Sequence, residues 1–165
     1  MATRLDIQEA LKQSMLKKDE LRTGTLRMLL AAVFNKEKEK RYKVSKAEPA
    51  LAEQELQVKS ELSLQELQDA VSFEVKKRRE AVEGFEKGGR KEQAEKERQE
   101  MEMLLPYLPA QLSEDEVRQL VKETIAKVGA AGPHDLGKVM GMLTPQTKGK
   151  ADGNLVSRIV KELLG

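Results

Sequence analysis

Two lysines flank a glycine near the end of the chain, in the stretch QTKGKADGN at 146–154. An amphipathic helix is predicted to begin directly after it, with Asp152 as its cap. The first amides of a helix lack partners within the helix and carry a partial positive charge, which suits a phosphate group. Lys148 and Lys150 add full charges, and Gly149 lets a ligand backbone come close. The stretch could therefore bind an anion or a nucleic acid, although its spacing alone favours a plain solvated loop.

A plain solvated loop is the alternative explanation, because Lys-Gly-Lys is common in surface turns and Asp152 could cap its own helix alone. Lys138 could join the turn if its helix packs beside the last one. Gly137 and Gly141 lie four residues apart on one face of that helix, at a cost of roughly 1 kcal/mol each relative to alanine. A neighbouring helix or a ligand backbone should therefore approach this face closely.

Three further patterns are better explained without a ligand. GPHDLGK at 132–138 has the spacing of a phosphate-binding loop, but Val139 stands where Ser or Thr is needed and no strand is predicted before it. KKRR at 76–79 points in different directions around a helix, which favours a solvated face. His134 lies at a predicted helix start, where an exposed residue is expected rather than a general base.

Composition excludes several classes of chemistry. The chain has no cysteine and one histidine, so thiolate nucleophiles, disulfides, Cys-based metal centres and two-His metal sites cannot be built from it. We predict no catalytic residue, no metal and no cofactor. No apolar run approaches the roughly 20 residues that span a membrane, and no signal-peptide core follows Met1. We expect a soluble cytoplasmic protein without a membrane partner.

Apolar residues recur with helical spacing and never with strand-like alternation, which predicts an all-α protein. Helices are expected over 4–18, from 19 into the charged stretch that follows Phe34, over 63–86 and over 90–105. Pro106 and Pro109 interrupt the helical pattern and mark a boundary between an N-terminal helical domain (1–108) and a C-terminal domain (109–165). Three more helices follow, ending with one from about Gly153 to Leu163.

The net charge of the whole chain is only +2, so attraction to nucleic acid would need local clustering of cations. The largest local excess lies in residues 27–46, which hold seven basic and two acidic side chains. The C-terminal stretch 137–164 carries five basic and two acidic side chains. Aromatic residues make up 3% of the sequence, so we expect little base readout and mainly backbone recognition.

Four segments together resemble the GatB/YqeY family, and more narrowly its stand-alone YqeY-like proteins: LRMLLAAV at 26–33, KKRREAVEGFEKGGRKEQAEKE at 76–97, LLPYLPAQLSEDE at 104–116 and GKVMGMLTPQTKGKADGNLVSRIVKELL at 137–164. The resemblance implies an N-terminal helical bundle with a long hairpin and a small C-terminal three-helix domain. That domain is similar to the tail of the B subunit of aspartyl/glutamyl-tRNA amidotransferase. The stretch around 44–62 is longer than the family pattern and has no functional interpretation.

In that enzyme the tail helps to hold the tRNA body. The resemblance therefore implies RNA contacts at a set of C-terminal positions: Lys138, Lys148, Gly149, Lys150, Gly153, Asn154 and Arg158. The catalytic cradle of the B subunit has no counterpart in this chain, and neither an amidase Ser-Ser-Lys arrangement nor a glutaminase cysteine is present.

The sequence thus predicts a non-catalytic protein that binds tRNA or another structured RNA, accessory or related to tRNA-dependent amidotransferases. A protein partner of the amidotransferase or synthetase type is possible, and no DNA is expected. Two alternatives stay open. The chain could be a helical adaptor that presents its 63–105 hairpin to a protein, or, less favoured, a carbon–nitrogen ligase with glutamine as amido-N donor.

Overall fold

The computed structural model describes residues 2–165. The protein is all-α, as predicted, and none of the described residues lies in a β-strand. The helices in chain order are α1 (Arg4–Leu16), α2 (Glu20–Ala47), α3 (Glu53–Ser60), α4 (Leu64–Lys87), α5 (Lys91–Leu104), α6 (Glu114–Val128), α7 (Leu136–Thr147) and α8 (Gly153–Leu164).

Helix starts follow local capping chemistry, which is why the sequence predicts them well. Thr3, Ser63 and Ser113 each accept a hydrogen bond from the third helical amide, and the acidic residue there bonds back to the cap backbone. Gly129 ends α6 in the left-handed region at φ 63°, a conformation that glycine adopts without steric cost. Glu66 and Glu116 thus complete capping boxes at the starts of α4 and α6.

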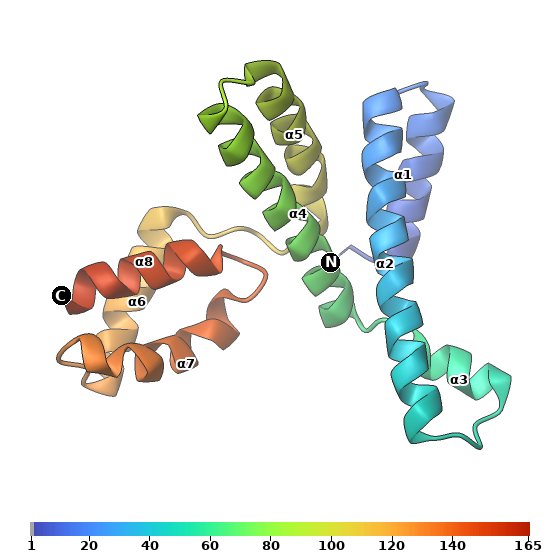
Figure 1. Ribbon diagram of the computed structural model, residues 1–165. Helices are drawn as coiled ribbons and strands as arrows, with labels where there is room; N and C mark the ends of the chain where they lie inside the picture. The colour runs from blue at the N-terminus through green and yellow to red at the C-terminus, as the bar shows by residue number, and fades with distance from the viewer. Residues whose placement is uncertain (1) are drawn as a thin grey trace. The chain divides into compact units, whose positions relative to one another are not determined.

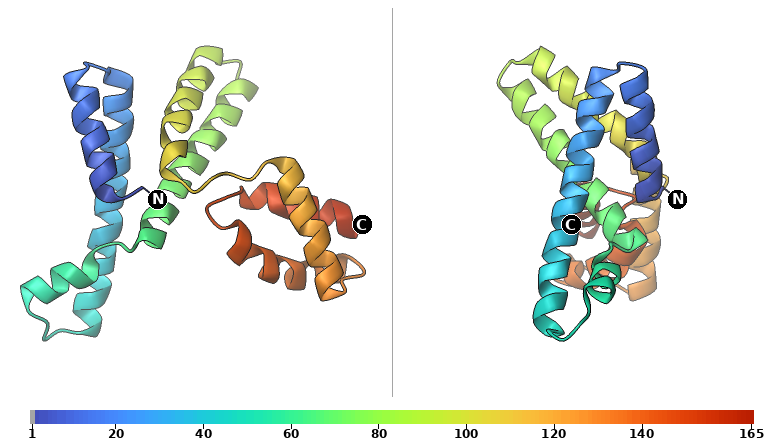
Figure 2. Two further views of the ribbon diagram at one scale, coloured as in Figure 1. Left: turned by 180° about the vertical axis from the view of Figure 1, so that it is seen from behind. Right: turned by 90° about the vertical axis from the view of Figure 1, so that its right-hand side faces the viewer.

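The chain divides into two units, Met1–Leu108 and Pro109–Gly165. That these two units are separate domains stays a prediction. In the first unit, α1 pairs with α2 and α4 pairs with α5 as two helical hairpins, and α3 lies beside the end of α2 (Figures 1 and 2). The hairpins share an apolar core: Ile7, Leu26, Leu29, Val33, Leu67, Ala70, Val71, Val75, Leu104 and Tyr107.

Phe34 does not face inward with Leu26, Leu29 and Val33, because its side chain is 49% exposed. The core side of α2 is already filled by these three aliphatic residues, which are at most 1% exposed. Phe34 follows Val33 and is therefore rotated by about 100° around the helix. Its ring lies at the edge of the core stripe, open to solvent.

The second unit is a three-helix domain with its own apolar core, formed by Val117, Val121, Val139, Leu143, Val156, Ile159 and Val160. Two ion pairs give the direction of α6 relative to α8: Glu114 meets Arg158 and Arg118 meets Glu162. Since both partners advance by four residues, the two helices run parallel. Lys138 near the start of α7 contacts Val128 at the end of α6, so α7 runs antiparallel to them.

Candidate nucleic-acid interface

The turn between α7 and α8 is held by the segment that leads into α6. The Gly149 carbonyl accepts a hydrogen bond from the Gln111 side-chain amide at 2.8 Å, and the Lys150 carbonyl accepts one from the Leu112 amide at 2.7 Å. Gly149 has a φ of +74°, which a residue with a side chain adopts only under strain. The turn predicted from sequence is therefore a fixed structure that brings Lys148, Gly149 and Lys150 to the start of α8.

The amides at the start of α8 are less available than the sequence suggested. The Asp152 carboxylate accepts from the Asn154 amide at 2.7 Å and from the Leu155 amide at 3.3 Å. The predicted cap is thus confirmed, and the expectation of bare amides is wrong at these two positions. A carboxylate one residue before a helix already provides the negative charge that its N-terminus favours. Gly153 and Asn154 lie beside the lysines, but a phosphate there would compete with Asp152.

Lys138 lies at the other end of α7 from the turn. Ten residues separate it from Lys148, which corresponds to about 15 Å along a helix axis. Its ammonium donates to the Val128 carbonyl at 2.6 Å, which satisfies an open carbonyl at the end of α6. Because a carbonyl carries no full charge, this bond itself leaves the positive charge of Lys138 in place, although that charge also acts on the nearby Asp135 carboxylate. The structure therefore does not gather Lys138 with the turn in one compact cluster.

One exposed face of α7 nevertheless runs from Gly137, beside Lys138, to Lys148. Gly137, Gly141, Pro145 and Lys148 are all exposed and follow one another at spacings of four, four and three residues, so they share one face of the helix. A Cβ added at Gly137 or Gly141 would meet no atom within 4 Å. Of the two predicted explanations for these glycines, a neighbouring helix is therefore ruled out, and a ligand backbone stays a prediction. We name this face, from Gly137 to Lys148, the α7 shelf.

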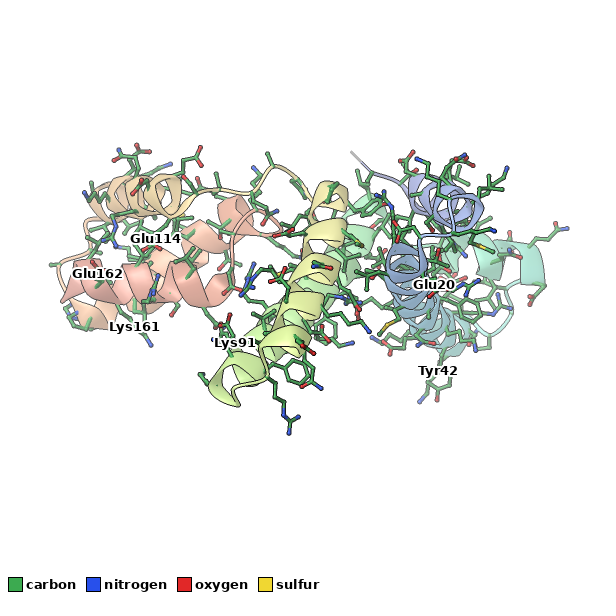
Figure 3. All side chains as sticks on the ribbon, turned by 90° about the horizontal axis from the view of Figure 1, so that it is seen from above. Glu20, Tyr42, Lys91, Glu114, Lys161 and Glu162 are labelled. Carbon is green, nitrogen blue, oxygen red and sulfur yellow. The ribbon has the colours of Figure 1, made fainter. Side chains whose placement is uncertain are left out.

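Arg158 is committed to an ion-pair network between α6 and α8. Its guanidinium lies 3.3 Å from both carboxylate oxygens of Glu114, which also pairs with Arg118 at 3.6 Å. Arg118 in turn bonds Glu162 at 2.8 Å and lowers the pKa of that carboxyl. Figure 3 labels both acidic residues. Arg158 is 65% exposed, so a ligand phosphate could reach it by displacing Glu114.

The basic excess in residues 27–46 is partly neutralised within the first unit. Lys40 bonds Glu66 at 2.6 Å and Arg41 bonds Glu53 at 2.6 Å, while Arg4 on α1 pairs with Glu37 at 2.8 Å. The Lys40 ammonium and the Ser63 amide lower the pKa of Glu66 from 4.5 to about 2. A count of basic residues along the sequence therefore overstates the charge that this region offers to a ligand.

Within KKRR, the predicted solvated face is wrong for Arg78. Its side chain is 4% exposed and pairs with Glu74 at 3.0 Å, which is 5% exposed, and with Glu100 at 3.3 Å. Arg78 Nη2 is buried without a hydrogen-bond partner. The position falls on the same helical stripe as Val71, Val75 and Val82, so the burial of Arg78 follows from the hairpin. His134, by contrast, is exposed as predicted, at 79%.

Residues 2–165 contain no group of three or more His, Asp or Glu side chains placed to hold a metal ion. None of the described helices is both long and apolar enough to cross a membrane. The molecule is thus an all-helical protein in which a glycine-lined helix face ends in a basic turn.

The chain belongs to the YqeY-like family, whose model matches residues 35–164. It is also similar to two characterised proteins. One is altered inheritance of mitochondria protein 41 from Eremothecium gossypii, at 34% identity over 104 residues. The other is the E subunit of glutamyl-tRNA(Gln) amidotransferase from Methanobrevibacter smithii, at 42% identity over 60 residues.

These two matches are partial. The first covers 63% of this chain and 48% of the fungal protein. The second covers 31% of this chain and 9% of the archaeal protein. The family is therefore that of the resemblance predicted from sequence, and the relation to amidotransferases is supported. The activities of the longer relatives do not follow from matches of this length.

Proposed function

We propose that this protein binds tRNA or another structured RNA through the α7 shelf and the turn that follows it. The observation that carries the proposal is the run of exposed small residues on α7, with Lys138 near one end and Lys148 at the other. Glycine in an exposed helix costs stability, and no atom of the protein lies against Gly137 or Gly141 to explain it. Close approach of a ligand backbone would explain why glycine occupies these two positions.

Charge in this region suits a polyanion. The hydrogen-bond partner of Lys138 is an uncharged carbonyl, and Lys150 is exposed at the turn. Arg158 extends the cationic surface along α8 once a phosphate replaces Glu114 as its partner. Contacts of this kind position a nucleic acid without reading its sequence, so we expect recognition of RNA shape and backbone through the proposed residues: Lys138, Lys148, Gly149, Lys150, Gly153, Asn154 and Arg158.

The similarity to part of a glutamyl-tRNA(Gln) amidotransferase supports tRNA as the RNA and an accessory role beside an amidotransferase. We propose a partner of the amidotransferase or synthetase type on the same ground. A pull-down from nuclease-treated lysate tests this partner separately. Recovery of such an enzyme after nuclease treatment supports direct contact, and its loss together with the RNA contradicts it.

A charge-reversal experiment tests RNA binding. Filter binding of tRNA to the K148E/K150E variant should fall by at least about tenfold at low salt. The slope of log K against log salt should also become less steep by about one to two, because two phosphate contacts disappear. The matched control is K91E/K96E on α5, which makes the same charge change at exposed lysines of the first unit. Equal affinities for the wild type and K148E/K150E contradict the proposal.

A cytoplasmic location is proposed from the sequence alone. The Eremothecium relative is named as a mitochondrial protein, which makes a mitochondrial location the competing prediction. Cell fractionation with the tagged chain tests the two. Recovery with mitochondria contradicts the cytoplasmic proposal, and recovery in the cytosolic fraction supports it.

A further inference from the structure

The aromatic residues of this chain are distributed unevenly. All five lie in the first unit, and residues 109–165 contain none. Three of the five have largely exposed side chains: Phe34 at 49%, Tyr42 at 67% and Phe73 at 55%. The unit proposed to hold the RNA backbone therefore has no Phe, Tyr or Trp ring on which a base could stack, while the other unit exposes three of its five rings.

Each exposed ring has a lysine ammonium beside it. Lys38 lies 4.7 Å from the centre of the Phe34 ring, and Lys46 lies 6.0 Å from the centre of the Tyr42 ring. Both distances fall within the range of cation–π attraction. The pairs combine a flat apolar surface with a positive charge, and nucleotides present the complementary combination of a base and a phosphate.

Phe34, Lys38, Tyr42 and Lys46 follow one another at intervals of four residues, so they form a continuous row along one side of α2. The row is about 18 Å long at 1.5 Å per residue, with its two rings about 12 Å apart along the axis. In Figure 3, Tyr42 lies on the side of α2 that faces away from α1. We name these four residues the α2 row.

Cations dominate the exposed surface around the α2 row. Among the exposed residues of α2 between 27 and 46, the charged ones are Arg27, Lys38, Lys43 and Lys46 against the single acid Glu39. The other acid of this stretch, Glu37, pairs with Arg4 and is 15% exposed. The row therefore complements an anionic ligand.

We propose that the α2 row binds unpaired nucleotides of RNA, with bases stacked on Phe34 and Tyr42 and phosphates on Lys38 and Lys46. This inference rests on the proposed RNA-binding function and adds a second contact region of a different kind. An amphipathic protein helix would need a continuous apolar ridge at spacings of three and four residues. The row instead alternates single rings with single cations, as surfaces that bind single strands do.

The test is fluorescence anisotropy with two labelled probes, an oligouridylate of about 12 nucleotides and a blunt RNA duplex of the same length. The F34A/Y42A variant should bind the oligouridylate at least about tenfold more weakly, because stacking on each ring is lost. Its affinity for the duplex should change less than about twofold, since paired bases cannot stack on protein rings.

Two controls separate stacking from general surface effects. Leu16 is 70% exposed and apolar, and L16A should leave both affinities unchanged. The F34Y/Y42F variant keeps both rings and should restore oligouridylate binding. Unchanged oligouridylate affinity in F34A/Y42A overturns the inference, and so does an equal loss in L16A.

The outcome for the α2 row can be told apart from that for the α7 shelf. K148E/K150E should lose tRNA and duplex binding while it keeps most of its oligouridylate affinity. Failure of that double variant to weaken tRNA binding overturns the proposed function alone. Loss of an acidic protein partner by F34A/Y42A, with oligouridylate binding unchanged, also overturns the inference and assigns the row to a protein.

Discussion

The two units of this protein differ in whether they bury charged side chains. In Met1–Leu108 the α4–α5 hairpin buries Arg78 and Glu74, at 4% and 5% exposure of their side chains. In Pro109–Gly165 the described buried side chains are apolar, apart from Thr124 and Thr147, and every charged group stays at the surface. The first unit buries some of its charged side chains, whereas the second keeps its charged side chains at the surface.

This difference shows why the densest basic segment of a sequence need not be its strongest anion-binding surface. Residues 27–46 have the larger excess of cations, yet Lys40 and Arg41 bond carboxylates of neighbouring segments. In the second unit the ammonium of Lys138 hydrogen-bonds a carbonyl, although its charge also acts on the Asp135 carboxylate. Which charges remain available depends on tertiary partners and not on the count.

The largest expected effect comes from a substitution that breaks the buried charge cluster of the first unit. R78A leaves the buried Glu74 and the partly buried Glu100 without their guanidinium, and loss of one partner of a buried pair costs about 3–5 kcal/mol. Urea unfolding followed by circular dichroism measures this loss. The matched control is K76A, in the same KKRR run but with a side chain 51% exposed, which should change stability by less than about 0.5 kcal/mol. Equal effects of the two substitutions contradict the assigned burial.

The apolar core of the second unit gives the next largest effect. Leu143 is fully buried, and L143A should cost about 2–5 kcal/mol through lost burial and a cavity. Hydrogen exchange should then accelerate throughout 109–165, while the α4–α5 hairpin stays protected. Faster exchange spread equally over both units would show that they unfold together, contrary to the separate cores described above.

A smaller effect comes from the ion-pair network of α6 and α8. E114Q removes the carboxylate that holds Arg158, so tRNA affinity should rise by about two- to fivefold as the guanidinium becomes available to phosphate. Stability should change by less than about 1 kcal/mol because these side chains are exposed. E123Q, at an exposed position of α6, makes the same charge change. An equal gain in E123Q would assign the effect to net charge instead of Arg158.

The smallest effect is a pH dependence located in the first unit. The Lys40 ammonium and the Ser63 amide hold the pKa of Glu66 at about 2, below its ordinary 4.5. A depressed pKa contributes stability above the unfolded value and loses it as the pH falls toward 2. Because the Glu66 side chain is 41% exposed, the contribution should be below about 1 kcal/mol. Unfolding between pH 5 and 2 should be less pH-dependent in E66Q, and identical profiles contradict this.

Local chemistry decided which features the sequence could predict. The caps at Ser63, Ser113 and Asp152 depend on residues two or three positions away, so they are readable from spacing. The burial of Arg78 depends on Glu100, 22 residues further on, and the pairing of Arg158 depends on Glu114, 44 residues away. No periodicity indicates such partners. The exposure of the Phe34 ring likewise depends on tertiary packing, because Leu26, Leu29 and Val33 occupy the core side of α2.

The candidate site was predictable in composition but not in arrangement. The turn at Lys148–Lys150 lies where the spacing indicated, and Asp152 caps the following helix as predicted. Lys138 lies at the far end of α7 from the turn, a separation that ten residues of helix already imply. The α7 shelf depends on the open space beside Gly137 and Gly141, which no sequence pattern indicates.

The most direct test of the central claim separates stability from binding at the α7 shelf. G137Q/G141Q adds long neutral side chains where a Cβ meets no atom within 4 Å, and it replaces poor helix formers by better ones, worth about 0.5 kcal/mol each. The account predicts a more stable protein that binds tRNA at least about tenfold more weakly. A variant that is more stable and binds tRNA as tightly as the wild type would contradict it.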